Sequence, residues 1–434
     1  MQPVALEAFV ESLTDTVLDW RYKGFSSLPD VRTVAQVQRD GVALHDLGTP
    51  MMTIDFSAVA DNLLAMATWC EARGLKLAPH GKTTMAPLLW LGQLLSGCSG
   101  ITVANASQLR AARAFGVANL QLANELVNRD DIAWVAGELQ RDPDFAFLCW
   151  VDSPAAVARL EAALVDRTVS VPIPVCVEMG AAAGRTGARD VETVLATARA
   201  VVASSRVVLA GICGYEGAVP AAGTDQAGLA AVDHYLASVV AAHAALTDLY
   251  ETPRVTVTAG GSAFFDRVAA VLGPLAEQTS GQPVDVVLRS GAYVVHDDIH
   301  YRDVTPSTRN DGPPLRAAIH VWAQVLSRPE PDQVILDAGR RDLPFDLGLP
   351  VVLSASRAGS PREDLSVEGA ELVRLNDQHG FVRVSPDSAL AVGDVVKLGL
   401  SHPCTAFDKW RAIAVIDSAD VPDPQVTDVA LTFF

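Results

Sequence analysis

The sequence lacks the features that would place it on a nucleic acid or in a membrane. Lys and Arg together number 33 against 51 Asp and Glu, so the formal net charge is -18 and no basic surplus is available for a phosphate backbone. No basic and apolar leader opens the chain, and no window of eighteen apolar residues is free of charges or turn residues. We therefore expect a cytoplasmic protein that binds neither nucleic acid nor membrane.

Cysteine and aromatic residues are also scarce. The six cysteines show no framework spacing, which excludes a small disulfide-stabilised scaffold. Aromatic residues make up only 6% of the chain although half of it is hydrophobic, and Ala, Val and Leu dominate, as is typical of α/β layers. At 434 residues the chain is long enough for two domains or for one barrel with an addition.

Short apolar runs recur between residues 75 and 290, each followed by a polar or glycine-containing break and a longer helical pattern. These runs are 75–80, 100–104, 119–123, 145–151, 173–179, 208–215, 255–260 and 284–290. Their Val- and Ile-rich, non-alternating character predicts parallel strands covered on both faces. Eight such units predict a TIM (β/α)8 barrel. A doubly wound open sheet is the alternative fold, but the first run lacks the Gly-rich turn that such a sheet would carry.

Different patterns flank the predicted barrel, which we place at 49–301. Residues 1–48 are expected to form a helical extension, because apolar residues recur in helical spacing. These residues are Leu6, Phe9, Val10, Leu13, Val17 and Leu18. The strand-like segment 51–56 is expected to join a C-terminal β domain at 316–434, where β-branched residues alternate with polar ones. Residues 302–315, rich in Pro, Gly, Asn and Ser, are predicted to be a linker.

Polar and glycine residues gather after the predicted strands, where such barrels carry their active sites. Lys82 follows the first strand, and a lysine that forms an imine must be deprotonated, which partial burial favours; an ordinary surface lysine is the alternative. Gly260, Gly261 and Ser262 follow the seventh strand, where backbone N–H groups can approach a phosphate, although such a turn could merely connect two elements. Together, an imine lysine and a phosphate cradle are the two anchors that pyridoxal 5'-phosphate (PLP) requires.

The β domain contributes a third cluster, in the segment SHPC. His402 and Cys404 are two residues apart, so on an extended segment both side chains would point to the same face. Imidazole and thiolate together favour Zn2+, or another divalent metal, and two protein ligands leave the open position that a catalytic zinc needs. The alternative is a buried cysteine beside a hydrogen-bonded histidine. Asp408 would either orient this site or be a solvated charge.

Eight motifs occur in the order seen in the eukaryotic-type D-serine dehydratase and D-threonine aldolase family, which this chain resembles from about Thr49 to its end. They are APHGKT (78–83), EMGAAAGRTG (178–187), GYEG (214–217), AGGS (259–262), SGAYV (290–294), DAGRR (337–341), NDQHG (376–380) and SHPC (401–404). That family has the alanine-racemase-like fold, PLP fold type III, in which a PLP-binding barrel is followed by a β domain.

The resemblance implies a role for each of the residues that match. Lys82 would carry PLP as an imine, Arg185 would face the pyridine nitrogen, and Tyr215 would line the cofactor. The remaining cofactor-binding residues, including those for the phosphate, would be His80, Gly260, Gly261, Ser262, Gly291, Ala292 and Tyr293. His402 and Cys404 would bind zinc, and a homodimer is expected, with each β domain near the barrel mouth of the other subunit.

The resemblance also implies a lyase that acts on D-configured β-hydroxy amino acids. Thr84 and Met85 stand where the family often has His and Lys, which leaves the substrate open between D-serine, D-threonine and 3-hydroxyaspartate. Because the aldolase branch typically has Asp at the second metal position, Cys404 favours a D-serine or D-threonine dehydratase that gives a 2-oxo acid and ammonia.

Several other activities remain as alternatives to the dehydratase. They are D-threonine aldolase-type cleavage to glycine and an aldehyde, a non-catalytic PLP-binding protein, and a cofactor-free Schiff-base aldolase. A racemase is disfavoured, since alanine-type racemases use a second-domain tyrosine and no Tyr follows Tyr301.

Overall fold

Eight parallel strands form the larger part of the fold. The computed structural model describes residues 3–28, 30–279, 281–309, 311–357 and 360–434. The strands are β5 (Lys76–Leu77), β6 (Ile101–Val103), β7 (Asn119–Glu125), β8 (Ala146–Val151), β9 (Ile173–Met179), β10 (Val207–Gly214), β11 (Val255–Ala259) and β12 (Val284–Leu288). Their order in the sheet is β5-β12-β11-β10-β9-β8-β7-β6. All eight runs predicted from the sequence are therefore confirmed as strands.

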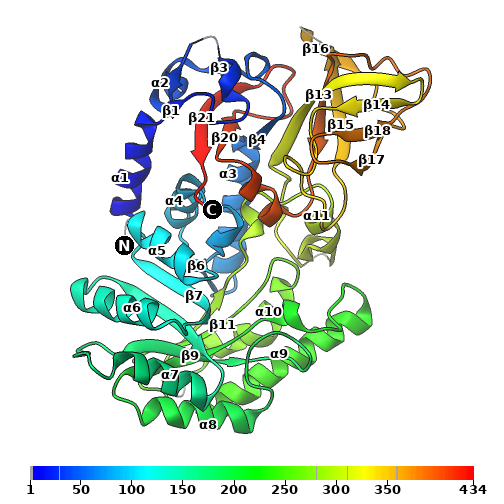
Figure 1. The fold of residues 1–434 in the computed structure, drawn as a ribbon. Coiled ribbons are helices and arrows are strands. Elements are labelled where there is room, and N and C mark those ends of the chain that lie inside the picture. The colour runs from blue at the N-terminus through cyan, green and yellow to red at the C-terminus, as the bar shows by residue number, and fades with distance from the viewer. Residues whose placement is uncertain (1–2, 29, 280, 310, 358–359) are drawn as a thin grey trace.

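The sheet closes into a barrel between its first two strands. A parallel bridge joins His80 to Thr102, and the Ser99 N–H donates to the Leu77 carbonyl at 2.8 Å. Along the strands the side chains are almost all buried, because helices cover the sheet from outside while other strand residues fill its interior. The TIM-barrel prediction is confirmed, and the lower part of Figure 1 shows this barrel in cyan and green.

Most of the outer helices begin where the chain offers a capping side chain. They are α3 (Phe56–Glu71), α4 (Pro87–Leu95), α5 (Ala106–Ala114), α6 (Arg129–Arg141), α7 (Pro154–Leu164), α8 (Val191–Val202), α9 (Gln226–Leu246) and α10 (Phe265–Leu272). Asn105, Ser153 and Asp190, for example, each accept a backbone N–H from the first turn of the helix that follows, which fixes where that helix starts.

One of these helices, α9, is long and apolar enough to span a membrane by length and composition alone. Its contacts give another explanation for its composition. It packs against β9 and β10 on one side and lies between α8 and α10. The apolar residues of α9 thus cover the barrel sheet, as expected for a core helix of an α/β fold.

A second, largely antiparallel sheet forms the rest of the fold. Its strands lie in the order β16 (Ser360–Leu365), β15 (Val351–Arg357), β19 (Val395–Gly399), β13 (Ile319–Glu330), β4 (Met51–Asp55), β20 (Ala412–Ile416), β21 (Gln425–Leu431) and β3 (Val42–Ala43). Three further strands, β14 (Gln333–Leu336), β17 (Glu371–Leu375) and β18 (Gly380–Arg383), are attached through β13. β4 precedes the barrel in sequence but lies between β13 and β20, so the second sheet contains chain from both sides of the barrel.

The N-terminal extension is only partly helical, which corrects the sequence prediction. It contains α1 (Val4–Ser12) and α2 (Val34–Asp40), but Val17 and Leu18 form β1, which pairs with β2 (Arg32–Thr33). The hydroxyls of Ser12 and Thr14 bond back to carbonyls of α1, an alternative to continuing the helix that sequence periodicity does not reveal. The extension shares a hydrophobic core with β20 and β21, and Figure 1 shows it in blue beside the red β21.

The segment 302–315, predicted to be a linker, has structure of its own in its described part. The turns α11 (His300–Val304) and η8 (Pro306–Arg309) occupy its first half. Arg309 then forms an ion pair with Asp266 of α10 at 2.8 Å and donates to the Ala263 carbonyl at 2.7 Å. The Pro and Gly content indicated the breaks correctly, but the tertiary contacts that fasten the segment to the barrel leave no local signal.

Candidate active site

A cavity of about 410 Å3 lies at the ends of the barrel strands, within the size range of small-molecule sites. It is lined by most of the residues predicted from the sequence, namely His80, Lys82, Arg185, Tyr215, Gly260, Gly261, Ser262, Gly291, Ala292, His402 and Cys404. Tyr293 is the exception: its ring is buried and its hydroxyl lies 3.7 Å from Cys98 Sγ. A second cavity of about 510 Å3, between residues 44–51 and the second sheet, contains none of the predicted residues.

Lys82 lies on a short helical turn directly after β5, η4 (Gly81–Thr83). Burial lowers the pKa of Lys82 from its usual value, and the positive charges of Arg185 and Arg289 lower it further, whereas Cys404 opposes the shift. The turn is closely packed, because a side chain at Gly81 would come within 2.6 Å of the Trp90 ring. The lysine is thus a partly desolvated amine in a fixed place, as nucleophilic or basic lysines require.

The two glycine-containing loops face the same cavity. The N–H groups of Gly260 and Gly261 donate to the carboxylate of Glu216, at 3.0 Å and 2.5 Å, and Glu216 is fully buried. These are the two N–H groups that the sequence predicts to bind the phosphate. Because both already donate to Glu216, a phosphate would compete with that carboxylate.

The neighbouring loop offers further hydrogen-bonding groups at the same end of the cavity. The Ala292 N–H donates to Ser262 Oγ at 3.2 Å. A side chain at Gly291 would meet the His80 carbonyl oxygen at 2.4 Å, so only glycine fits there.

Two arginines reach the cavity rather than the one predicted. Arg185 lies 4.7 Å above the Tyr215 ring, which brings together two residues expected near the cofactor. Arg289 is almost fully buried and donates to Thr258 Oγ1 at 2.8 Å and to the Gly214 carbonyl at 2.6 Å. The sequence contained a signal for Arg289, since it is a charged residue directly after the apolar run 286–288.

The His402–Cys404 pair lies on a short turn, η9 (Pro403–Thr405), and not on the extended segment that the sequence argument assumed. Pro403 is well suited to the first position of such a turn. Both side chains nevertheless line the cavity, so the prediction was right about their proximity and wrong about its cause. His402 adopts φ 26°, a strained conformation for a residue with a side chain, and such strain is typical of functional sites.

Asp346 holds the imidazole of His402 in place. Its Oδ2 lies 2.6 Å from His402 Nδ1, while its Oδ1 accepts from Thr405 Oγ1 at 2.8 Å. Metal-binding histidines commonly have such a carboxylate on the ring nitrogen that does not bind the metal. Asp346, which the sequence did not indicate, therefore has the orienting role considered for Asp408. Asp408 instead lies 3.8 Å from the ammonium of Lys409.

The donor groups of the cavity fit both PLP and a metal. His80 Nδ1 and Glu178 Oε2 are buried without a hydrogen-bond partner among the described residues, and a polar ligand would satisfy such groups. Cys404 Sγ lies 3.3 Å from Thr83 Oγ1, directly beside the lysine turn. Within the described ranges no group of three or more His, Cys, Asp or Glu side chains is arranged to hold a metal, so His402 and Cys404 would leave positions for water or substrate.

The chain is similar to known proteins over most of its length. Residues 318–416 match the family model of a putative serine dehydratase domain. The chain is 29% identical to D-threonine aldolase from an Arthrobacter species over 387 residues, which cover 88% of this chain and 93% of that protein. It is 25% identical to 3-hydroxy-D-aspartate aldolase from Paracoccus denitrificans, over 86% and 90% of the two chains.

The chain is thus similar over most of its length to D-threonine aldolase and 3-hydroxy-D-aspartate aldolase, and its C-terminal part matches the serine dehydratase domain model.

Solved structures of similar proteins have the same fold. D-threonine aldolase from Filomicrobium marinum superposes with a TM-score of 0.73 at 22% identity, covering 90% of this chain and 97% of that one. D-threo-3-hydroxyaspartate dehydratase from Delftia sp. HT23 follows with 0.68 at 21% identity, covering 90% and 99%. An alanine racemase from Clostridium difficile reaches 0.58 at 12% identity, covering 85% and 95%, so the alanine-racemase-like fold is confirmed.

Proposed function

We propose that the protein is a PLP- and zinc-dependent lyase that dehydrates D-serine or D-threonine to a 2-oxo acid and ammonia. The observation that carries the proposal is that Lys82, the glycine loops and the His402–Cys404 pair line one cavity. The relatives are aldolases and dehydratases of D-configured β-hydroxy amino acids, which supports the coarser class of D-β-hydroxy amino acid lyase.

The residues of this chain divide the reaction between them. Bound PLP would supply an electron sink for negative charge at Cα, and zinc would supply a Lewis acid for the β-hydroxyl. Lys82 Nζ, a neutral amine when desolvated, would take the α-proton as general base. His402 and Cys404 would hold the metal, with Asp346 orienting the imidazole. Loss of the α-proton and the β-hydroxyl gives an aminoacrylate, which water converts to the 2-oxo acid and ammonia.

Cys404 favours dehydration over aldol cleavage. Solved structures of D-threo-3-hydroxyaspartate dehydratase include a variant with a cysteine replaced, in a metal-free form, and a variant with a histidine replaced two positions earlier. His402 and Cys404 have the same spacing, which supports zinc and the dehydratase reaction.

The similarity to D-threonine aldolase favours a second candidate, retro-aldol cleavage to glycine and an aldehyde. In that reaction the same metal site would assist deprotonation of the β-hydroxyl, and the Cα–Cβ bond would break.

The products distinguish the two reactions. Purified protein with PLP and zinc is incubated separately with D-serine, D-threonine and D-threo-3-hydroxyaspartate, with the L-forms as controls. We expect ammonia and 2-oxo acid from a D-form, lost on chelation and restored by zinc. Glycine with an aldehyde would replace the dehydratase by the aldolase, and PLP binding without turnover of any substrate would favour a non-catalytic PLP-binding protein.

A further inference from the structure

We propose that Lys23, in the N-terminal extension, is a positioning residue for the metal motif. This inference rests on the proposed function, because it assigns Lys23 a part in holding His402 in the orientation that binds zinc. Lys23 does not line the cavity. It acts through two loops that come from the opposite end of the chain.

The ammonium of Lys23 makes three contacts with these two loops. Its Nζ lies 2.8 Å from Asp342 Oδ1 and 2.9 Å from the Arg341 carbonyl oxygen. It also lies 4.5 Å from the centre of the Trp410 ring, a cation–π contact. The side chain of Asp342 is 2% exposed, whereas that of Lys23 is 41% exposed, so the contact neutralises a buried carboxylate from the protein surface.

Asp342 and Trp410 connect this contact to the metal motif. Asp342 Oδ2 accepts the Gly339 N–H at 3.1 Å, and the Asp342 carbonyl accepts Trp410 Nε1 at 3.1 Å. Four residues after Asp342, Asp346 contacts His402 Nδ1 and Thr405. Asp342 therefore fixes the segment just before Asp346, and Trp410 fixes the segment just after the metal motif. Both groups contact Lys23.

The surroundings of Lys23 hold it against these loops. Gly24 follows with φ 80°, a conformation that favours glycine, and its carbonyl accepts the Gly48 N–H at 2.8 Å. Phe25 is buried in the core shared with β20 and β21. Leu18, before Lys23, is buried in the same core. Because the extension is anchored on both sides of Lys23, the ammonium can transmit this anchoring to the loop at Asp342.

Removal of the ammonium would leave Asp342 buried without its cation, which is costly unless the loop rearranges toward water. Rearrangement of this segment would move Asp346 and free the imidazole of His402 to rotate. Loss of a carboxylate that orients a metal-binding histidine weakens metal affinity about 10- to 100-fold. We expect a smaller loss, about 10-fold, when that carboxylate is displaced rather than removed.

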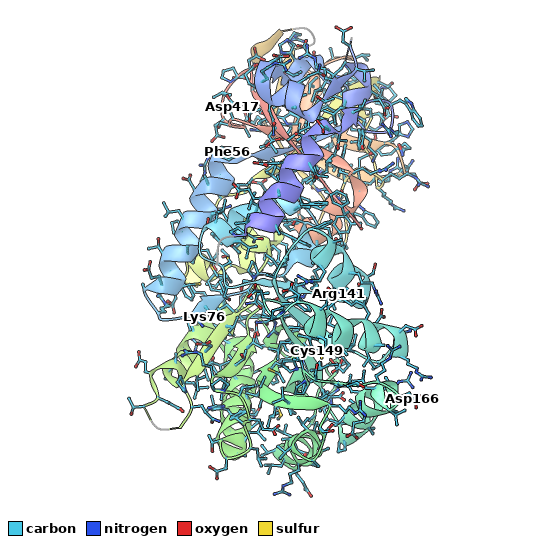
Figure 2. The ribbon with its side chains drawn as sticks, turned by 90° about the vertical axis from the view of Figure 1, so that its left-hand side faces the viewer. Phe56, Lys76, Arg141, Cys149, Asp166 and Asp417 are labelled. Atoms are coloured by element: carbon cyan, nitrogen blue, oxygen red, sulfur yellow. The ribbon has the colours of Figure 1, made fainter. Side chains whose placement is uncertain are left out.

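The test is Lys23→Met, which keeps the apolar stem and removes the charge. Its matched control is Lys76→Met, since Lys76 pairs with Asp285 at 2.6 Å and has a similarly exposed side chain. Lys76, labelled in Figure 2, lies at the start of β5 and does not line the cavity. Zinc affinity is measured by competition with a chromogenic chelator, and PLP affinity is measured by absorbance titration. The thermal midpoint of unfolding is measured for both variants. Zinc affinity is expected to fall about 10-fold in Lys23→Met, with PLP affinity within twofold of wild type and Lys23→Arg close to wild type.

Each outcome decides the proposal. Unchanged zinc affinity in Lys23→Met, or an equal loss of zinc affinity in Lys76→Met, overturns the proposal. A loss of PLP affinity as large as the loss of zinc affinity also overturns it, because Lys23 would then support the fold as a whole. A wild-type protein that takes up no zinc overturns the metal in the proposed function as well. If Lys23→Met does not fold, Trp410→Phe decides by the same zinc measurement, since it removes the indole N–H bond to the Asp342 carbonyl and keeps an aromatic ring beside Lys23.

Discussion

The two halves of the candidate site are built in different ways. Lys82 follows a barrel strand whose backbone is bonded on both sides, with the Ala78 N–H donating to Leu288 and the Thr102 N–H to Pro79. His402 lies on a turn between strands of the second sheet, with a strained φ, and its imidazole is held by a carboxylate 56 residues earlier in the chain. The lysine half is therefore rigid through local barrel structure, whereas the metal half depends on contacts between distant segments. Loss of a single side chain should consequently remain local on the lysine half and spread on the metal half.

The largest expected effect is that of Lys82→Ala on the barrel half. Removal of both the base and the covalent anchor should reduce turnover of the D-amino acid at least about 1,000-fold and abolish the visible imine absorbance. The thermal midpoint should change little, because a methyl group fits a wall of the cavity. Turnover by Lys82→Ala at the wild-type rate would contradict the assignment of the site.

Cys404→Ala tests the metal half directly. Turnover should fall about 100-fold or more, since the Lewis acid for the β-hydroxyl would be lost, while the PLP absorbance should remain. Zinc content by elemental analysis, together with the absorbance spectrum, separates the two effects. If the PLP signal disappeared together with the zinc, the two halves would not be independent.

Asp346→Asn should have an intermediate effect that is confined to the metal half. The amide can still contact His402 but lacks the charge, so zinc affinity should fall about 10- to 100-fold and excess zinc should restore most of the turnover. Chelator competition gives the affinity, and Lys76→Met serves as the control. Wild-type zinc affinity in Asp346→Asn would show that the Asp346 carboxylate does not orient the His402 imidazole.

The smallest expected effect is a pH dependence inside the barrel half. Burial, followed by the carboxylates of Glu178 and Asp152, raises the pKa of Glu125 to about 8, from 4.5 in an unfolded chain. Because the folded state favours the protonated form, the free energy of unfolding should decrease as the pH rises from about 4.5 to about 8, with no further loss above that.

Glu125→Gln removes this titration. The variant should therefore gain stability relative to the wild type between pH 5 and pH 8, as measured by urea unfolding at both pH values. A stability difference that does not change with pH would show that Glu125 is ionised throughout.

The same contrast explains which predictions from the sequence were correct. The eight barrel strands and the lysine and glycine motifs at their ends could be predicted, because an apolar run flanked by helical patterns and turn residues is a local signal. His402 and Cys404 were also found, but the predicted extended segment was wrong, since Pro403 starts a helical turn. The helical spacing through Val17 and Leu18 was misleading because pairing with β2 outweighed it.

The sequence by itself determined the barrel, the β-rich second part and many of the residues that line the cavity, since each is encoded within a few neighbouring positions. Only the tertiary structure decided that Asp346 orients His402, that Glu216 takes the N–H groups of Gly260 and Gly261, and that Lys23 neutralises Asp342. These contacts join residues between 44 and 319 positions apart, and their geometry exists only after the distant segments that carry them have folded together. A local sequence pattern carries no record of such distances, because they follow from how the whole chain folds.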